Sequence, residues 1–537
     1  MKLCIAAQCR PQNKCRRRVL LVFFALFVPI ALDAAPSRAA VHPFESDVPF
    51  SPRNGIDSLI LPALRQRGIE PANLCSDAVF VRRVYMDVIG TLPQAQDVRK
   101  FLADENPDKR AVLIDDLLER ETFADYWSLK WCDILRVKAE FPINLWPNAV
   151  QAYHRWIHTC LRDNMPYDQF SRALLTSSGS NFRVPPVNFY RALQGHEPSA
   201  IAEAVALTFM GVRLIQWPEQ RRKGMEAFFS RVAYKSTAEW KEEIVHLDPA
   251  ADTPLRAVLP DGREIIIPTG RDPREVFADW LIDADNPWFA RNIVNRIWAW
   301  LFGRGIIHEP DDIRPDNPPV HPLLLRFLEK ELVKAEYDLR HIYRRILNSG
   351  TYQQSCIPRG DPEQAETLFA CYPVRRLDAE VLIDALCGIS GTRESYSSAI
   401  PEPFTFVPEE NRSIELADGS ITSQFLEMFG RPSRDTGLVS ERNNEPSDAQ
   451  RLHLLNSSHI QNKIERSGRI NGLTRFARGN PRTLANMIYL SVLSRYPTQA
   501  ELVVVQQYTE TKGMNIRNAT HDLVWALINT KEFLYRH

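Results

Sequence analysis

The chain has 537 residues, of which 44% are hydrophobic and 25% charged, and it carries equal numbers of acidic and basic residues. This composition is typical of a soluble globular protein with enough apolar residues for a sizeable core, and it excludes a disordered or fibrous chain. The first 39 residues include seven basic residues and one acidic residue, so the remainder has a net charge of −6. A basic nucleic-acid-binding surface is therefore not expected.

The N-terminal segment, residues 1–39, has the three parts of a secretory signal peptide. A basic stretch at residues 2–18 precedes an apolar run at residues 19–32, and small residues around Ala39 suit a signal peptidase. The alternative is a membrane anchor, but the apolar run is interrupted by Pro29 and is short for a bilayer span. We therefore expect an exported protein, periplasmic or otherwise extracytoplasmic, without a stable membrane span after cleavage.

Short helical patterns fill most of residues 40–235, which we interpret as an all-α N-terminal domain. Capping and turn sequences separate the helices, as at residues 106–108 (Asn-Pro-Asp). Residues 163–195 end in a polar stretch interrupted by Gly and Pro, which predicts an irregular loop. Six cysteines follow residue 39, but none is in a Cys-x-x-Cys pair, so no structural zinc motif is present.

A change of composition at residues 236–272 indicates a linker. Within it a Pro-Asp-Gly turn at residues 260–262 lies between two strand-like runs, which predicts a β-hairpin. Residues 273–537 then read as a second helical domain that closes in an amphipathic bundle. The predicted fold is mainly α, with two helical domains, long irregular loops and a minor β-hairpin near the domain connection.

The densest pattern lies in residues 285–355. A helix over residues 290–301 has one apolar face, and Asn295 and Arg296 lie on the other. A long polar, proline-rich loop follows at residues 308–321, and such a loop between core helices is more often functional than a plain connector. Its candidate site residues are Asp311, Asp312, Arg314 and His321.

A second charged cluster spans residues 431–444, with Arg434, Asp435 and Arg442 as candidate site residues. Both loops lie between strongly apolar helices, where unpaired charges are costly to bury. We therefore expect the two loops to meet in the main polar cleft, with Asp311 or Asp312 pairing Arg434 or Arg442. Complete pairing would indicate structural bracing, whereas free cations facing a concavity would indicate a site for an anionic or hydroxyl-rich ligand.

Standard catalytic motifs do not occur: the chain has no Gly-x-Ser-x-Gly, His-Glu-x-x-His, P-loop or dinucleotide fingerprint. Asp311, Asp312 and Asp435 could hold calcium through oxygen ligands. Two carboxylates could instead act as acid and base in glycoside cleavage, which requires a defined separation. Helix capping, salt bridges and loop bracing account for the same residues, so all three interpretations stay open.

Several long motifs carry a resemblance to known families. NPWFARNIVNRIWAWLFGRG and the DDIRPDNPPVHPLL loop resemble the Planctomycetes-specific (PSD) domain, and FVRRVYMDVIGTLP and MPYDQFSRALLTSSGSNFRVPPVNFYR resemble the Planctomycetes cytochrome-type (PSCyt) domain. Both families are of unknown function. Relatives commonly carry a Cys-x-x-Cys-His haem attachment motif where this chain has residues 215–220, IQWPEQ. The resemblance therefore implies that covalent haem c is absent here.

Three functions remain open at this point. The first is a haem-less extracytoplasmic binding or assembly component, for polysaccharide or for another secreted protein. The second is a hydrolase or other enzyme that acts on polysaccharide through the carboxylate and arginine cleft. The third is electron transfer, against which the missing haem motif argues.

Overall fold

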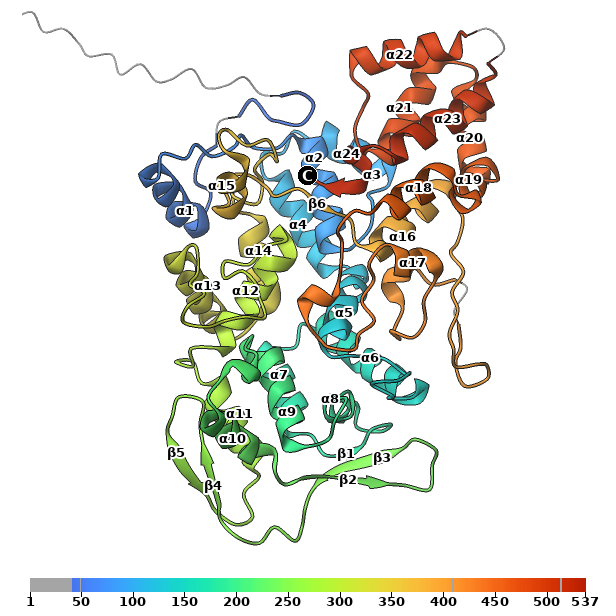
Figure 1. Cartoon of the computed structure of the whole chain (residues 1–537). Coiled ribbons are helices and arrows are strands. Elements are labelled where there is room, and N and C mark those ends of the chain that lie inside the picture. The colour runs from blue at the N-terminus through green and yellow to red at the C-terminus, as the bar shows by residue number, and fades with distance from the viewer. Residues whose placement is uncertain (1–40, 49, 408–409, 512–513) are drawn as a thin grey trace, which may run out of the picture. The chain divides into compact units, whose positions relative to one another are not determined.

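The computed structural model describes residues 41–537, apart from residue 49, residues 408–409 and residues 512–513 (Figure 1). The predicted signal peptide lies outside the described residues. Residues 40–537 form one compact unit. In this described part of the chain, no helix combines the length and the apolar character that crossing a bilayer requires.

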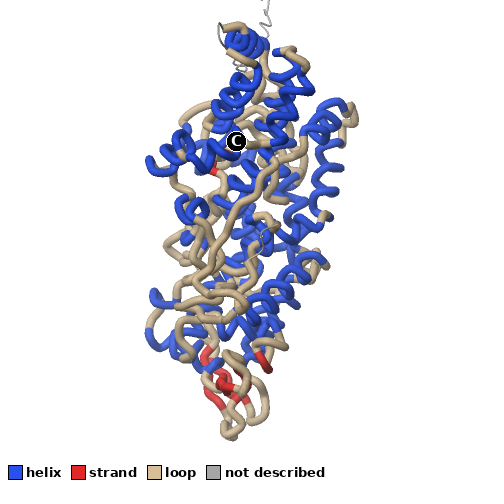
Figure 2. The backbone as a smooth tube through the Cα atoms, turned by 90° about the vertical axis from the view of Figure 1, so that its right-hand side faces the viewer, coloured by secondary structure: helices blue, strands red, loops and turns tan. Residues whose placement is uncertain are grey.

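Helices dominate the fold, with 53% of residues in helix and 6% in strand, which confirms the mainly α prediction. Figure 2 shows that most of the strands gather at one end of the unit. The first helices are α1 (Gly55–Gln66), α2 (Asp77–Val88), α3 (Ala95–Ala103), α4 (Lys109–Glu119), α5 (Glu121–Ile134), α6 (Pro147–Arg162) and α7 (Tyr167–Thr176).

Local capping explains where several of these helices begin. The Asn54 side chain accepts from the backbone of Ile56 and, with Asp57, forms the capping box of α1. The Ser76 hydroxyl caps α2 by accepting from the Val79 amide. Helix α5 is buried along almost its whole length and packs against α6, so it lies at the centre of the core.

The middle of the chain contains short helices and the strands. Its helical elements are a 3-10 turn (Pro185–Val187), α8 (Asn188–Arg191), α9 (Pro198–Val205), a π-helical turn (Ala206–Met210), a 3-10 turn (Leu214–Gln216), α10 (Glu219–Glu226) and a 3-10 turn (Ala227–Phe229). The strands are β1 (Gly179–Ser180), β2 (Val232–Ser236), β3 (Glu243–Leu247), β4 (Leu255–Val258) and β5 (Glu264–Ile267).

The predicted hairpin is β4–β5, which pairs antiparallel with Leu255 opposite Ile267. A second antiparallel sheet, in the order β1-β3-β2, has no counterpart in the sequence-based expectations. Its register places Val232 opposite Leu247 and Gly179 opposite Val245.

The helix predicted over residues 290–301 is α12 (Phe289–Phe302), and it ends at Gly303, whose φ of 75° is left-handed. Helix α11 (Pro273–Ile282) precedes it in the chain. The helices that follow it are α13 (Pro322–Lys334), α14 (Leu339–Leu347) and α15 (Pro362–Thr367). Next come α16 (Ala379–Ser390), a 3-10 turn (Ser413–Glu415), α17 (Gln424–Met428) and a 3-10 turn (Val439–Glu441).

The chain closes in the predicted helical bundle. Its helices are α18 (Asp448–Asn456), α19 (Ser458–Glu465), α20 (Gly468–Ala477), α21 (Pro481–Val492), α22 (Gln499–Thr509), α23 (Ile516–Ile528) and α24 (Lys531–Leu534). The final strand β7 (Tyr535–Arg536) pairs with β6 (Arg375–Arg376) and so ties the end of the chain to the segment before α16.

Helices from the N-terminal and C-terminal parts share one hydrophobic core. Helix α7 packs on α11, α4 on α14 and α3 on α21. Trp127 of α5 lies against Tyr343 and Trp300, with ring centroids 4.5 Å and 5.3 Å away. The division of the chain at residues 236–272 into two domains stays a prediction.

Candidate functional site

The polar face of α12 is buried and tied to backbone groups. Asn295 donates to the Ile307 carbonyl at 3.0 Å and accepts from the Ile307 amide at 2.8 Å, so it fixes the chain just before loop 308–321. Arg296, also fully buried, donates to the Thr208 carbonyl at 2.8 Å. Both side chains therefore brace the packing of α12, and neither faces solvent.

Asp311 connects the two predicted loops. One of its carboxylate oxygens lies 2.7 Å from the guanidinium of Arg296, and the other accepts from the Val439 amide at 2.6 Å. Because Asp311 is only 1% exposed, this contact joins loop 308–321 to segment 431–442 inside the protein. The two loops meet here through a backbone amide.

The other candidates of the first loop lie apart from the second loop. Asp312 pairs with its neighbour Arg314 at 3.1 Å, and Arg314 also pairs with Asp316. His321 Nε2 donates to the Leu368 carbonyl at 3.1 Å, and burial lowers the pKa of its imidazole. These contacts are local bracing, so the sequence grouped His321 with residues that it does not contact.

Arg434 and Arg442 find their carboxylates outside the first loop, contrary to the expected pairing. Asp133 of α5 accepts from Arg434 at 3.0 Å and from Arg442 at 2.7 Å. Glu380 of α16 accepts from Arg442 at 2.6 Å. The expected partners Asp311 and Asp312 pair with Arg296 and Arg314 instead. Asp133 lies near the arginines because α5 is at the centre of the core.

The residues suggested as calcium ligands each face a cation instead. Asp435 lies 2.7 Å from Lys138 Nζ, while Asp311 and Asp312 pair with arginines. Over residues 41–537, leaving aside the undescribed positions, no three His, Cys, Asp or Glu side chains are grouped as metal ligands. Calcium binding therefore stays a prediction without a ligand set.

Asp378 is the centre of a buried charged network that sequence reasoning missed. Its carboxylate lies 2.8 Å from Lys130 Nζ and 3.3 Å from the Arg536 guanidinium, and it accepts from Asn444 at 2.8 Å. Burial would raise the pKa of Asp378, but Lys130, Arg536 and Arg442 together hold it well below its usual value. The carboxylate is therefore ionised at neutral pH.

This network forms the floor of a polar cleft of about 750 Å³. Residues 308–310 of the first loop and residues 439–446 border the cleft together. Burial, followed by repulsion from Arg442, lowers the pKa of Lys130 to about 8. Arg304 also lines the cleft, and its side chain forms no hydrogen bond or ion pair with the residues that the structure describes.

The buried carboxylates of this cleft are poor candidates for acid–base chemistry. Glycoside cleavage requires one carboxylic acid that keeps its proton near neutral pH. Asp378 is held ionised by three cations. Glu380, which contacts Arg442 but does not line the cleft, is engaged by Arg442 and Arg431. The network therefore acts mainly as bracing between α5, α16 and the end of the chain.

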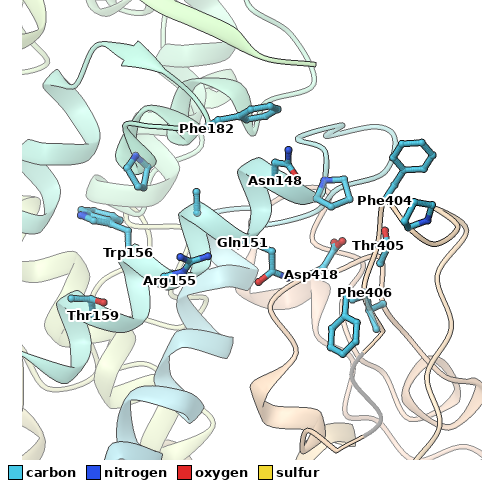
Figure 3. A pocket seen from close by; sticks show the side chains of 15 residues that line it. Asn148, Gln151, Arg155, Trp156, Thr159, Phe182, Phe404, Thr405, Phe406 and Asp418 are labelled. Carbon is cyan, nitrogen blue, oxygen red and sulfur yellow. The ribbon is translucent and has the colours of Figure 1, made fainter. Parts of the chain in front are cut away.

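A second concavity, of about 730 Å³, lies between α6 and the loop at residues 403–406. We call it the aromatic groove. Figure 3 shows Trp156 and Phe182 on one side of the groove and Phe404 and Phe406 on the other. Phe404 and Phe406 are 56% and 76% exposed, so the groove presents aromatic surface to solvent.

One rim of the aromatic groove is a row of free polar side chains. Asn148, Gln151 and Arg155 recur at helical spacing on α6 and are exposed. None of the three side chains is hydrogen bonded or ion paired within the described part of the chain. Trp156 stacks on Phe170 with an interplanar angle of 9° and a centroid distance of 5.0 Å, which fixes its ring at the groove.

Sequence reasoning missed this groove because its two sides lie far apart in the chain. In the sequence, the exposed row on α6 can be recognised only as a polar helix face with a tryptophan beside it. This pattern is the one signal of the groove that the sequence offers. The facing Phe404 and Phe406 belong to a stretch without periodicity, so only the fold shows that they lie opposite α6.

Residues 215–220, where the haem attachment motif was expected, are mostly exposed to solvent. Residues 215–220 include Trp217, and the Arg221 guanidinium lies over its ring at 3.7 Å. The absence of covalent haem stays a prediction.

Two family matches cover most of the chain. Residues 55–233 match PSCyt2, described as a protein of unknown function (DUF1549). Residues 273–509 match PSD1, described as a protein of unknown function (DUF1553). No curated protein and no solved structure gives a significant match to the chain.

Proposed function

From the premise that this chain carries a PSCyt2 domain followed by a PSD1 domain, we propose that it is an exported, extracytoplasmic component that binds polysaccharide. The observation that carries the proposal is the aromatic groove, with exposed rings on both sides and an unpaired polar row on α6. The signal-peptide pattern at residues 1–39 supports export.

The groove has the two kinds of surface that a sugar polymer needs. The C–H faces of a sugar ring are apolar and gain from packing on aromatic side chains such as Phe406. Its hydroxyl groups lie at the ring edge and need donors and acceptors, which the amides of Asn148 and Gln151 and the guanidinium of Arg155 offer. Among the described residues these side chains have no hydrogen-bond or ion-pair partner, so binding a sugar would break no such contact.

Binding is favoured over the hydrolase alternative by the state of the carboxylates. Asp418 lines the groove, but one of its oxygens accepts from the backbone amides of Ala139 and Ser420 at 2.9 Å and 2.8 Å. This oxygen is therefore occupied in holding the backbone of the loop. Asp378, the buried carboxylate that lines the polar cleft, is likewise paired with Lys130.

The proposal is tested by affinity electrophoresis of the full chain through gels that contain neutral, carboxylated or sulfated polysaccharides. We expect at least one polysaccharide to retard the chain without being shortened, as judged by reducing ends. Release of reducing ends would favour the hydrolase instead. Unchanged mobility in every gel would contradict polysaccharide binding and favour a protein partner.

A further inference from the structure

A separate cavity of about 330 Å³ lies beside residues 435–438, away from the aromatic groove. Its walls are largely apolar, with Leu193, Leu207 and Leu438 among them. Two arginines, Arg136 and Arg213, line the same cavity. We call it the arginine pocket.

Arg136 is a buried cation without a carboxylate partner. It is 4% exposed, and its Nε donates to the Thr436 carbonyl at 3.1 Å. Its Nη1 is buried without a hydrogen-bond partner, and no ion pair to Arg136 occurs among the described residues. Burial lowers the pKa of Arg136 to about 10, and the carboxylates of Glu441 and Glu203 compensate only in part.

The backbone at Gly437 leaves room for the guanidinium of Arg136. Gly437 has a φ of 75°, and a Cβ at that position would lie 2.9 Å from Nε and 3.0 Å from Cζ of Arg136. Any larger residue would displace the arginine or strain the backbone. Position 437 therefore allows a buried, unpaired guanidinium to lie against the chain.

Arg213 adds a second free cation. It is half-buried, its Nε is buried without a partner, and its side chain forms no hydrogen bond or ion pair in the described structure. Some buried arginines have a carboxylate, as Arg434 has Asp133. Others have none but donate from both terminal nitrogens, as Arg82 does to the carbonyls of Val492 and Phe533. The terminal nitrogens of Arg136 and Arg213 have neither kind of partner among the described residues.

The acidic groups around the pocket do not neutralise the two arginines. Asp435 lies against Lys138 at 2.7 Å, and Glu441 accepts from the backbone amides of Asp435 and Thr436 at 2.9 Å and 3.0 Å. Glu203 lines the pocket but is exposed and not ion paired with the described residues. An uncompensated buried charge is costly, so an external anion would relieve it.

We propose that the arginine pocket binds a small organic carboxylate. The carboxylate would accept from Arg136 and Arg213, since guanidinium groups match its planar geometry. The apolar part of the ligand would lie against Leu193, Leu207 and Leu438, which an inorganic anion would leave uncovered. This binding site is separate from the polysaccharide groove and does not depend on it.

The test is thermal unfolding of the full chain with acetate, butyrate and hexanoate, compared with sulfate and chloride at equal ionic strength. We expect the melting temperature to rise most with hexanoate, because each added methylene strengthens binding by up to about fourfold. A response to sulfate alone, or the same response to every salt, would overturn the proposal.

Two variants locate the effect, with calorimetric titration of hexanoate as the readout. Arg213→Gln should weaken binding at least about tenfold, because a charged hydrogen-bond donor is lost. Arg136→Gln should abolish binding and leave the melting temperature of the empty protein unchanged or higher. The exposed Arg482→Gln is the matched control and should bind as the wild type does. Unaltered affinity in Arg213→Gln would overturn the assignment, even if Arg136→Gln failed to fold.

Discussion

Two buried arginines depend on the carboxylate of Asp133. Arg434 is fully buried and has Asp133 as its only carboxylate partner in the described structure, at 3.0 Å, while Arg442 lies 2.7 Å from the same group. Asp133→Ala should therefore destabilise the fold by about 3–5 kcal/mol, because it leaves an uncompensated charge inside the protein. The free energy of unfolding in urea measures the loss.

The control for this variant is an exposed ion pair. Asp116 is 55% exposed and pairs with Arg120 one helical turn away at 2.6 Å. Asp116→Ala should cost less than about 1 kcal/mol, because solvent screens the pair. Equal losses in the two variants would show that Arg434 does not depend on Asp133.

The second residue-scale prediction concerns Asp378 at acid pH. The folded protein holds the pKa of Asp378 well below 3.8, the ordinary value that the unfolded chain recovers. Unfolded chains therefore take up a proton near pH 3.8 while folded chains do not, so this stabilisation is complete above that pH and is lost as the pH falls below it.

Asp378→Asn should remove this contribution. Urea unfolding between pH 6 and pH 3 should show a steeper loss of stability in the wild type than in the variant, although the variant is less stable at pH 6. Parallel curves for the two proteins would contradict the charged network around Asp378.

The residue identities in the buried networks were predictable only in part. The sequence marks Arg296, Asp311 and Arg434 because they are charged and lie beside apolar runs. It does not indicate their partners, since Asp133 is 301 positions from Arg434 and the two meet only through the fold. A local pair such as Asp312 and Arg314 is within reach of sequence reasoning, but it is also the more exposed one.

At the scale of elements, helices were predicted well because their signals are local. Helix α12 follows from its apolar period and its glycine stop, and α4 (Lys109–Glu119) from the turn before it. The β2–β3 pair was missed because its strands are mixed in polarity and its turn, residues 237–242, has no Asn-Gly or Pro-Gly signal. The groove face of α6 was missed because a polar helix face looks the same whether or not another loop lies opposite it.

The stop of α12 gives a prediction at this scale. Gly303 has a φ of 75°, and a Cβ there would meet Arg375 Cδ at 3.0 Å. Gly303→Ala should destabilise the protein by about 1–2 kcal/mol in urea unfolding, because a non-glycine residue is strained in that conformation.

Gly472 is the matched control within a helix. It lies inside α20, and a Cβ there would meet no atom within 4 Å beyond the helix's own backbone. Gly472→Ala should stabilise the protein by about 0.5–1 kcal/mol, because alanine loses less backbone entropy than glycine on folding. The same sign for both variants would contradict the left-handed stop at Gly303.

At the scale of the whole molecule, helices of the two family regions pack against each other. Helices α3 and α4 of the first region pack on α21 and α14 of the second. The order of families along the chain is visible in sequence motifs, whereas this interleaving depends on long-range packing that motifs do not encode. The polar cleft gains residues from both family regions for the same reason.

Export is the whole-molecule prediction that the N-terminal pattern makes. Protein isolated from its native cell should begin near Ala40, because a signal peptidase would cut after the small residues around Ala39. Mass spectrometry of the intact protein and N-terminal sequencing measure this. An unprocessed Met1 on protein from the cytoplasmic fraction would contradict export.

The central claim, polysaccharide binding in the aromatic groove, is tested most directly by calorimetric titration of four proteins with the polysaccharide found by gel retardation. These are the wild type, Gln151→Ala, Phe406→Ser and Phe476→Ser; Phe406 and Phe476 are 76% and 75% exposed, so the last variant is a matched control outside the groove. The account predicts that Gln151→Ala and Phe406→Ser each weaken binding about tenfold, or about 1.4 kcal/mol, while Phe476→Ser binds as the wild type does. Equal affinities in all four proteins would contradict the groove as the binding site.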